Sequence, residues 1–170
     1  MALDANRPDL TVGVIGTGAM GRGIVQVAAA GGMRVLMTDA RPGAAQEARE
    51  FVEKMVLRAA EKGSMTKDDA VAAVNRVSVV GGPAEMKPCH IVVEAIVENL
   101  DAKQQLFAQL EETVAPDCIL VTNTSSLSVT TIASKLKTPK RFAGLHFFNP
   151  VPLMRLVEVI EGLRTEEWVV

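Results

Sequence analysis

Short apolar runs rich in β-branched residues recur along the chain and predict buried strands. Residues 10–15 form the first run, which ends abruptly in glycines. An alanine-rich segment over residues 19–30 follows, and two glycines close it as they would close a helix. A second strand is expected over residues 34–39. These segments predict one strand, helix, strand unit of about 30 residues, the length that a right-handed parallel crossover requires.

A long polar stretch with helical periodicity separates this unit from the next strand. Pro42 near its start and Gly63 bracket one charge-rich helix. Thr66, followed three residues later by Asp69, is typical of the N-terminal cap of a second helix. We therefore expect a helical hairpin inserted at about residues 43–75, projecting from the sheet where it could cover a ligand.

The rest of the chain alternates between strand and helix patterns. Further strands are expected over residues 76–80, 90–95, 119–122 and 141–147, and further helices over residues 100–114 and 129–136. Strands that alternate with helices predict an α/β fold with a doubly wound, Rossmann-type parallel sheet. The last strand, over residues 156–160, follows "NPVP", a link too short for a parallel crossover. We therefore expect an antiparallel edge strand there.

Composition fits a single ordered domain over residues 1–170. Hydrophobic residues make up 48% of the chain and charged residues 22%, as in globular rather than disordered proteins. A net charge of -2 with scattered lysines and arginines gives no reason to expect nucleic acid as a partner. The N-terminus does not read as a secretory signal, and no apolar run approaches the roughly 18 residues of a membrane span. We expect a cytoplasmic protein without a membrane partner.

The two cysteines do not have the spacing of a metal site. Cys89 and Cys118 lie 29 residues apart without a CxxC pair, which favours two buried thiols over zinc or a disulfide. His90, beside Cys89, has no partner at a matched distance, so we interpret it as structural. No metal is expected.

The segment "GTGAMG", which begins at Gly16, lies where a dinucleotide-binding loop must lie, after a strand and at the start of a helix. Gly16 permits the tight turn, Gly18 lets the backbone approach a diphosphate, and Gly21 lets helix and strand pack closely. The diphosphate would rest on free amides at the helix N-terminus. The loop therefore predicts a dinucleotide cofactor.

Asp39 strengthens this interpretation, because it closes the second strand 18 residues after Gly21. An acid at that place accepts hydrogen bonds from the adenosine ribose and disfavours a 2'-phosphate, which favours NAD over NADP. Arg41 keeps NADP open as the less favoured choice. The alternative is an ordinary glycine turn in which Asp39 only caps the loop.

His146 and Glu158 are each six residues from Pro152. If the loop folds the two strands antiparallel, the two side chains come close across the ladder. Glu158 lies between Val157 and Val159, and a carboxylate in so apolar a strand is costly to bury without a partner. A glutamate bonded to one ring nitrogen makes the other a better proton acceptor, so the spacing indicates a general base. A core histidine without catalytic function is the alternative.

Two further polar segments follow predicted strands. "NTSSL", which begins at Asn123 and includes Ser125, offers an amide and hydroxyls at the carboxyl edge of the sheet, where open α/β sheets bind ligands. A plain polar turn explains the pattern equally well. Glu94, Glu98 and Lys103 surround the end of another strand. Solvated charges at a helix start explain Glu98 and Lys103 about as well as a binding site.

Four segments together resemble the L-3-hydroxyacyl-CoA dehydrogenase family over residues 12–162. They are "GTGAMGRGI", "VVEAIVENL", "NTSSL" and "GLHFFNPVPLMRLVEVI", in the family's order. The resemblance implies that His146 is the catalytic base, Glu158 its orienting partner, Ser125 a contact to the substrate oxygen and Asn149 a supporting polar group. It also implies a set of contacts to NAD: Gly16, Gly18, Ala19, Met20, Gly21, Asp39, Glu98, Lys103 and Asn123.

The resemblance further implies an activity of fatty acid β-oxidation. An L-3-hydroxyacyl-CoA would lose its hydroxyl proton to His146 and its C3 hydride to NAD, giving a 3-ketoacyl-CoA. The inserted hairpin would contribute to the coenzyme A site, with Lys62 as the candidate phosphate contact. Family members have a C-terminal helical domain that completes the acyl pocket and usually forms a homodimer. We expect that domain to be absent from this chain, which would then be weakly active or inactive alone.

Two other functions stay open at this point. The first is a binding module that has kept NAD but lost turnover, since fold never guarantees activity. The second is a related dehydrogenase that acts on a free hydroxy acid through the same histidine and glutamate. The long hairpin favours a coenzyme A substrate over a free acid.

Overall fold

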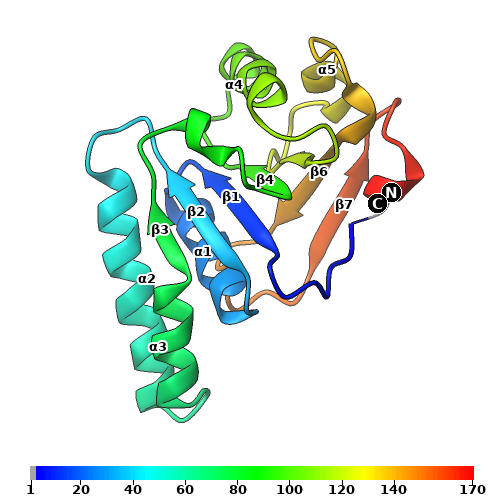
Figure 1. The fold of residues 1–170 in the computed structure, drawn as a ribbon. Coiled ribbons are helices and arrows are strands. Elements are labelled where there is room, and N and C mark those ends of the chain that lie inside the picture. The colour runs from blue at the N-terminus through cyan, green and yellow to red at the C-terminus, as the bar shows by residue number, and fades with distance from the viewer. Residues whose placement is uncertain (1–2) are drawn as a thin grey trace.

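The computed structural model describes residues 3–170, which build one seven-stranded sheet (Figure 1). The strand order is β3-β2-β1-β4-β5-β6-β7. The strands are β1 (Thr11–Ile15), β2 (Arg34–Thr38), β3 (Val77–Val79), β4 (Ile91–Glu94), β5 (Ile119–Thr122), β6 (Phe142–Phe147) and β7 (Val157–Glu161). All neighbours are parallel except β6 and β7, which are antiparallel. The predicted α/β fold, with its Rossmann-type sheet and antiparallel edge strand, is confirmed.

Helices cover both faces of the sheet (Figure 1). One face carries α1 (Ala19–Ala30), α2 (Ala44–Glu61) and α3 (Lys67–Asn75). The other carries α4 (Leu100–Thr113), α5 (Val129–Ala133) and the short 3-10 turn η1 (Pro83–Met86). Because successive strand residues point to opposite faces, Val35 belongs to the first hydrophobic core and Leu36 to the second. Two further 3-10 turns are η2 (Pro139–Arg141) and η3 (Glu167–Val169).

The helical hairpin predicted at about residues 43–75 is present as α2 and α3, and it projects beyond the sheet (Figure 1). The Thr66 hydroxyl accepts the amide hydrogen of Asp69 at 3.0 Å and so caps α3 as the sequence indicates. Gly63 adopts a φ of 76° in the turn between the helices, a conformation that favours glycine. Local capping and turn chemistry therefore define this hairpin.

Several predicted boundaries are wrong by a few residues. The helix expected to reach residue 136 ends at Ala133, because Ser134 and Leu136 donate to carbonyls three residues earlier, in tighter turns than an α-helix. β3 is shorter than residues 76–80, and β7 ends one residue later than expected. These differences leave the order of the elements unchanged.

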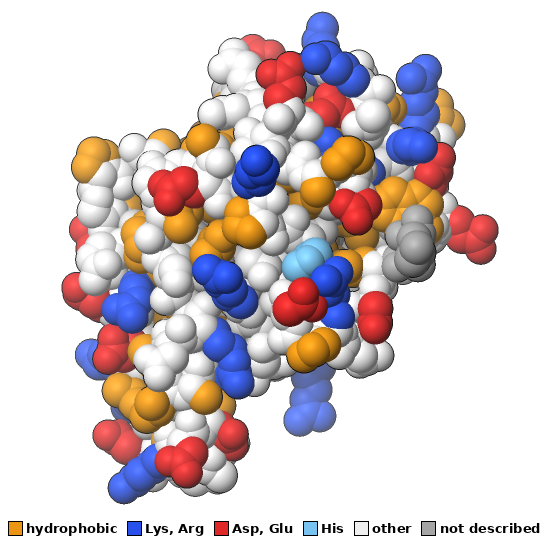
Figure 2. Space-filling view, viewed as in Figure 1, with side chains coloured by type: hydrophobic (Ala, Val, Ile, Leu, Met, Phe, Trp, Pro, Cys, Tyr) orange, Lys and Arg blue, Asp and Glu red, His pale blue; other side chains and the backbone are white. Residues whose placement is uncertain are grey.

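Residues 3–170 contain no helix that is both long and apolar enough to cross a membrane. In the same range, no cluster of three or more His, Cys, Asp or Glu side chains could hold a metal ion. Cys89 and Cys118 are free and buried, and burial raises the pKa of each thiol to about 12, so neither is a reactive thiolate. Charges of both signs are interspersed over the face in Figure 2.

Candidate active site

The glycine loop joins β1 to α1 and leaves an open place beside the helix N-terminus. Gly16 has a φ of 91°, and a Cβ there would collide with the Ala95 carbonyl. A Cβ at Gly21 would collide with the Gly16 carbonyl, so position 21 requires glycine as well. Among residues 3–170, nothing apart from its chain neighbours lies within 4 Å of a Cβ built on Gly18, and no side chain caps α1. The loop therefore fits a diphosphate on free helix amides.

Asp39 follows β2 and braces this loop. Its Oδ2 accepts the Thr17 amide hydrogen at 2.7 Å and the Thr17 hydroxyl at 2.9 Å, while Oδ1 accepts the Arg41 amide hydrogen at 2.9 Å. Partial burial opposes ionisation, but the hydrogen bonds from Arg41 and Thr17 outweigh it and lower the pKa of Asp39. The loop-capping alternative therefore describes part of its role. A carboxylate has about four lone-pair positions, so the predicted ribose contact stays open.

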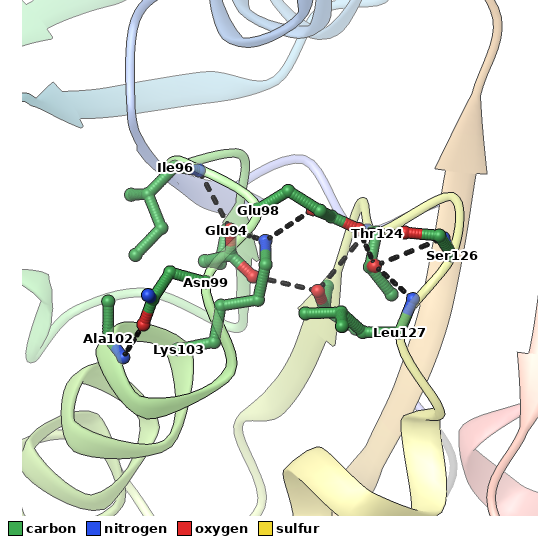
Figure 3. A network of polar contacts seen from close by, with 10 residues as sticks. Glu94, Ile96, Glu98, Asn99, Ala102, Lys103, Thr124, Ser126 and Leu127 are labelled. Carbon is green, nitrogen blue, oxygen red and sulfur yellow. Dashed lines mark hydrogen bonds and ion pairs between the residues drawn. The ribbon is translucent and has the colours of Figure 1, made fainter.

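Lys103 is the centre of a buried polar network (Figure 3). Its Nζ lies 2.6 Å from Glu94 Oε1 and 3.3 Å from Glu98 Oε2. The Lys103 side chain is 1% exposed and that of Glu94 is fully buried, so the solvated-charge alternative is wrong for Lys103. Helix α4 places Lys103 on the same face as the buried Phe107 and Leu110, which explains its depth.

The loop after β5 is tied to the same network. Glu98 Oε1 accepts hydrogen bonds from the hydroxyls of Thr124 and Ser126. Burial opposes ionisation of Glu98, but the Thr124 hydroxyl and the Lys103 ammonium outweigh it and lower the pKa. Asn123 Oδ1 accepts the Phe147 amide hydrogen at 2.9 Å and joins this loop to the end of β6. Ser125, between Thr124 and Ser126, is exposed.

His146 and Glu158 meet across the β6–β7 ladder. They are paired in the register, and His146 Nδ1 lies 2.8 Å from Glu158 Oε2. The expectation that the two side chains approach one another is therefore confirmed. Glu158 is not in a buried strand, however, because its side chain is 50% exposed and its neighbours Val157 and Val159 are exposed too. β7 lies at the sheet edge, with β6 as its one neighbouring strand in the ladder.

One cleft of about 370 Å³ brings most of these groups together. The predicted site residues that line it are Met20, Glu98, Lys103, Asn123, Ser125, His146 and Asn149. Met20 lies in the first turn of α1, and five other predicted residues lie outside the cleft: Gly16, Gly18, Ala19, Gly21 and Asp39. Glu158 does not line the cleft, but it contacts His146, which does.

Two residues of this site carry no predicted role in the sequence interpretation: Glu94, which contacts the lining residue Lys103, and Phe148, which lines the cleft. Glu94 is fully buried, and a carboxylate at the end of an apolar strand indicates that it has a buried partner. In the β4–β5 ladder, it lies opposite Thr122, whose hydroxyl donates to its Oε2 at 2.7 Å. Phe148 also lines the cleft, with its ring centroid 4.6 Å from that of His146. An aromatic residue two positions after the histidine gives no specific signal.

Comparison with known proteins assigns the chain to a family. A model described as "3-hydroxyacyl-CoA dehydrogenase, NAD binding domain" matches residues 11–170. The chain belongs to this family. A probable 3-hydroxybutyryl-CoA dehydrogenase of Bacillus subtilis is 45% identical over 154 residues, which are 91% of this chain and 54% of that protein. A 3-hydroxyadipyl-CoA dehydrogenase of Escherichia coli is 42% identical over 160 residues, 94% of this chain and 34% of that protein.

A solved member of the 3-hydroxyacyl-CoA dehydrogenase family has the same fold. The crystal structure of 3-hydroxybutyryl-CoA dehydrogenase from Escherichia coli K12 superposes with a TM-score of 0.92 at 42% identity, covering 95% of this chain and 34% of that one. The chain therefore spans about half of the Bacillus relative and about a third of the Escherichia relatives. The family model supports an NAD-type cofactor. The roles of individual residues, the C-terminal helical domain and the homodimer stay predictions.

Proposed function

We propose that the protein containing this chain oxidises an L-3-hydroxyacyl-CoA to the 3-ketoacyl-CoA with NAD. The observation that carries this proposal is the 2.8 Å contact of Glu158 with His146, which lines a cleft together with Ser125 and with Met20 from the first turn of α1. A base, a hydroxyl donor and a dinucleotide loop are the parts that such an oxidation needs. NAD, when bound, supplies the hydride acceptor.

The chain's own residues would handle the proton. Glu158 holds Nδ1 of His146, which leaves Nε2 to take the substrate hydroxyl proton. The Glu158 carboxylate then stabilises the imidazolium that forms. Ser125 would donate a hydrogen bond to the substrate oxygen as its charge changes, and Asn149 would support the substrate from the next loop. The reverse proton path serves reduction of the ketone.

The cofactor would be held by two groups of residues. The loop Gly16, Gly18, Ala19, Met20 and Gly21 would hold the diphosphate, and Asp39 the adenosine ribose. Glu98, Lys103 and Asn123 would contact the other half of NAD from the cleft wall. The open space beside Gly18 and the uncapped start of α1 support this assignment.

A second groove favours a coenzyme A thioester over a free hydroxy acid. It has a volume of about 290 Å³ and lies between α1, α2 and the loop after β6. Asn149 lines both this groove and the cleft, so a long substrate could occupy both. Lys62 at the exposed end of α2 is the candidate phosphate contact. Comparing 3-hydroxybutyrate with its coenzyme A thioester in an NADH absorbance assay separates the two substrate classes.

The experiment that tests the proposal compares two histidine variants in the natural gene product containing this chain. His146→Gln should lower kcat for acetoacetyl-CoA reduction by about 10²- to 10⁴-fold while NADH affinity changes little. His90→Gln is the matched control, because His90 Nδ1 only accepts the Thr11 amide hydrogen at 3.0 Å. Equal losses of turnover and NADH affinity in His146→Gln would remove the catalytic assignment. Tight NAD binding without turnover in the unaltered protein would favour a binding module.

A further inference from the structure

Two carboxylates and one ammonium group form a network at the wall of the cleft, which Glu98 and Lys103 line and behind which Glu94 is buried. Glu94 and Lys103 form a pair that is almost completely withdrawn from solvent. Glu98 is the network's second carboxylate (Figure 3). Its side chain is 39% exposed and lines the cleft. With all three ionised, the network carries one net negative charge. Where that charge lies depends on which carboxylate neutralises the lysine.

Glu94 is the partner that neutralises Lys103. Its Oε1 lies 2.6 Å from Lys103 Nζ, against 3.3 Å for Glu98. Glu94 also accepts the Ile96 amide hydrogen and the Thr122 hydroxyl, each at 2.7 Å, and it does not line the cleft. A fully buried carboxylate is stable only with such partners. The negative charge of Glu94 therefore interacts with the Lys103 ammonium group and not with groups in the cleft.

Glu98 keeps its charge toward the cleft. Its closest partners are the hydroxyls of Thr124 and Ser126, which hold the carboxylate in place without neutralising it. The lowered pKa of Glu98 keeps the group ionised at neutral pH. The same cleft contains His146 and Met20. A nicotinamide ring that exchanges hydride with a substrate bound at His146 must lie in this cleft.

We propose that Glu94 is a positioning residue that takes up the charge of Lys103, so that Glu98 presents a net negative charge to the nicotinamide and favours NAD⁺ over NADH. The nicotinamide ring of NAD⁺ is cationic and that of NADH is neutral, so one fixed charge distinguishes them by Coulomb attraction. The inference rests on the proposed function, which brings the nicotinamide into the cleft. It adds a preference for the oxidised cofactor.

The test is a calorimetric titration of the 170-residue chain with NAD⁺ and, separately, with NADH. The readout is the ratio of the Kd for NAD⁺ to the Kd for NADH. In Glu94→Gln, Lys103 has only Glu98 left to pair with, so the ratio should rise about fivefold to tenfold, the scale of one partly screened charge. Glu98→Gln should raise the ratio in the same direction. Glu112→Gln, in an exposed pair with Lys137, should leave it unchanged.

A double variant distinguishes a Glu94 that acts by neutralising Lys103 from a Glu94 that only supports the fold. Glu94→Gln with Lys103→Met removes both members of the buried pair and leaves the Glu98 charge alone, so the ratio should return to within about twofold of the original. A ratio that stays as high as in Glu94→Gln would overturn the positioning role. If Glu94→Gln does not fold, an unchanged ratio in Glu98→Gln overturns the proposal by itself. Failure of the unaltered chain to bind either dinucleotide would overturn the proposed function as well.

Discussion

Two side chains that line one cleft, Lys103 and His146, are each paired with carboxylates, and the two sets of pairs differ in burial. Lys103 lies buried between Glu94 and Glu98, whereas His146 and Glu158 are 19% and 50% exposed. Glu94 ends β4, which has a neighbouring strand on each side. His146 and Glu158 lie on β6 and β7, at the edge of the sheet. Burial fixes charges because an unpaired charge there is costly, while a partly exposed imidazole can gain and lose a proton. The centre of the sheet therefore suits a constant charge and the edge suits proton transfer.

The largest effect should come from breaking the buried pair. We expect Lys103→Met to lower the free energy of unfolding by about 3–5 kcal/mol, because Glu94 is left buried without a counterion. Urea denaturation of the chain, followed by circular dichroism, measures the loss.

The matched control is Lys137→Met. Lys137 Nζ lies 2.9 Å from Glu112 Oε1, and both side chains are exposed. The control should therefore lose less than about 1 kcal/mol. Similar losses in Lys103→Met and Lys137→Met would mean that burial does not distinguish the two pairs.

Changing the His146–Glu158 pair should lower turnover more than it lowers stability. Glu158→Gln should lower kcat about tenfold to a hundredfold in the natural gene product, because the neutral amide no longer stabilises the imidazolium of His146. The same change should cost less than about 1 kcal/mol of unfolding free energy, since the Glu158 side chain is half exposed. Steady-state kinetics and urea denaturation give the two numbers.

Glu161→Gln is the control for this variant. Glu161 is an exposed acid on the same strand, paired in the ladder with Ala143 rather than with the histidine. It should leave kcat within about twofold of the original. A Glu158→Gln variant that loses stability but keeps its kcat would assign the His146 contact to folding alone.

The contact between His146 and Glu158 was predictable from sequence because it depends only on their spacing from the turn. Two residues at equal distances from Pro152 must come close if a short loop reverses the chain, and His146 and Glu158 do so. The exposure of Glu158 was not predictable from its neighbours. Val157 and Val159 make the strand look buried, but an edge strand is covered only by whatever packs on it, which local pattern does not encode.

The buried network was only half predictable. Lys103 is at a helix start rich in charges, which is typical of solvated positions. Its spacing from Phe107 and Leu110 places it on the apolar face of α4, and that signal was available. The pairing of Lys103 with Glu94 depends on how α4 packs over β4, a tertiary contact that no local pattern contains. The role of Asp39 in bracing Thr17 depends on tertiary geometry in the same way.

The smallest effect should be a pH dependence at Glu98, which lies between the two extremes of burial. Burial raises the pKa of Glu98, but the Thr124 hydroxyl and the Lys103 ammonium bring it below the ordinary 4.5. A carboxyl whose pKa is lower in the folded state stabilises the fold above its unfolded-state pKa, and this contribution is lost as pH falls through the folded-state pKa. The difference in unfolding free energy between the original chain and Glu98→Gln should therefore shrink below about pH 4.5.

Glu111 offers the control for this pH dependence. Burial raises its pKa too, but hydrogen bonds from the Thr138 hydroxyl and from the amides of Lys137 and Thr138 lower it overall. Urea denaturation between pH 7 and pH 3 should show the same trend for Glu111→Gln as for Glu98→Gln. Only Glu98→Gln should change the NAD⁺ to NADH affinity ratio, because Glu98 lines the cleft and Glu111 does not. A stability difference that stays constant across this pH range would contradict a lowered pKa at Glu98.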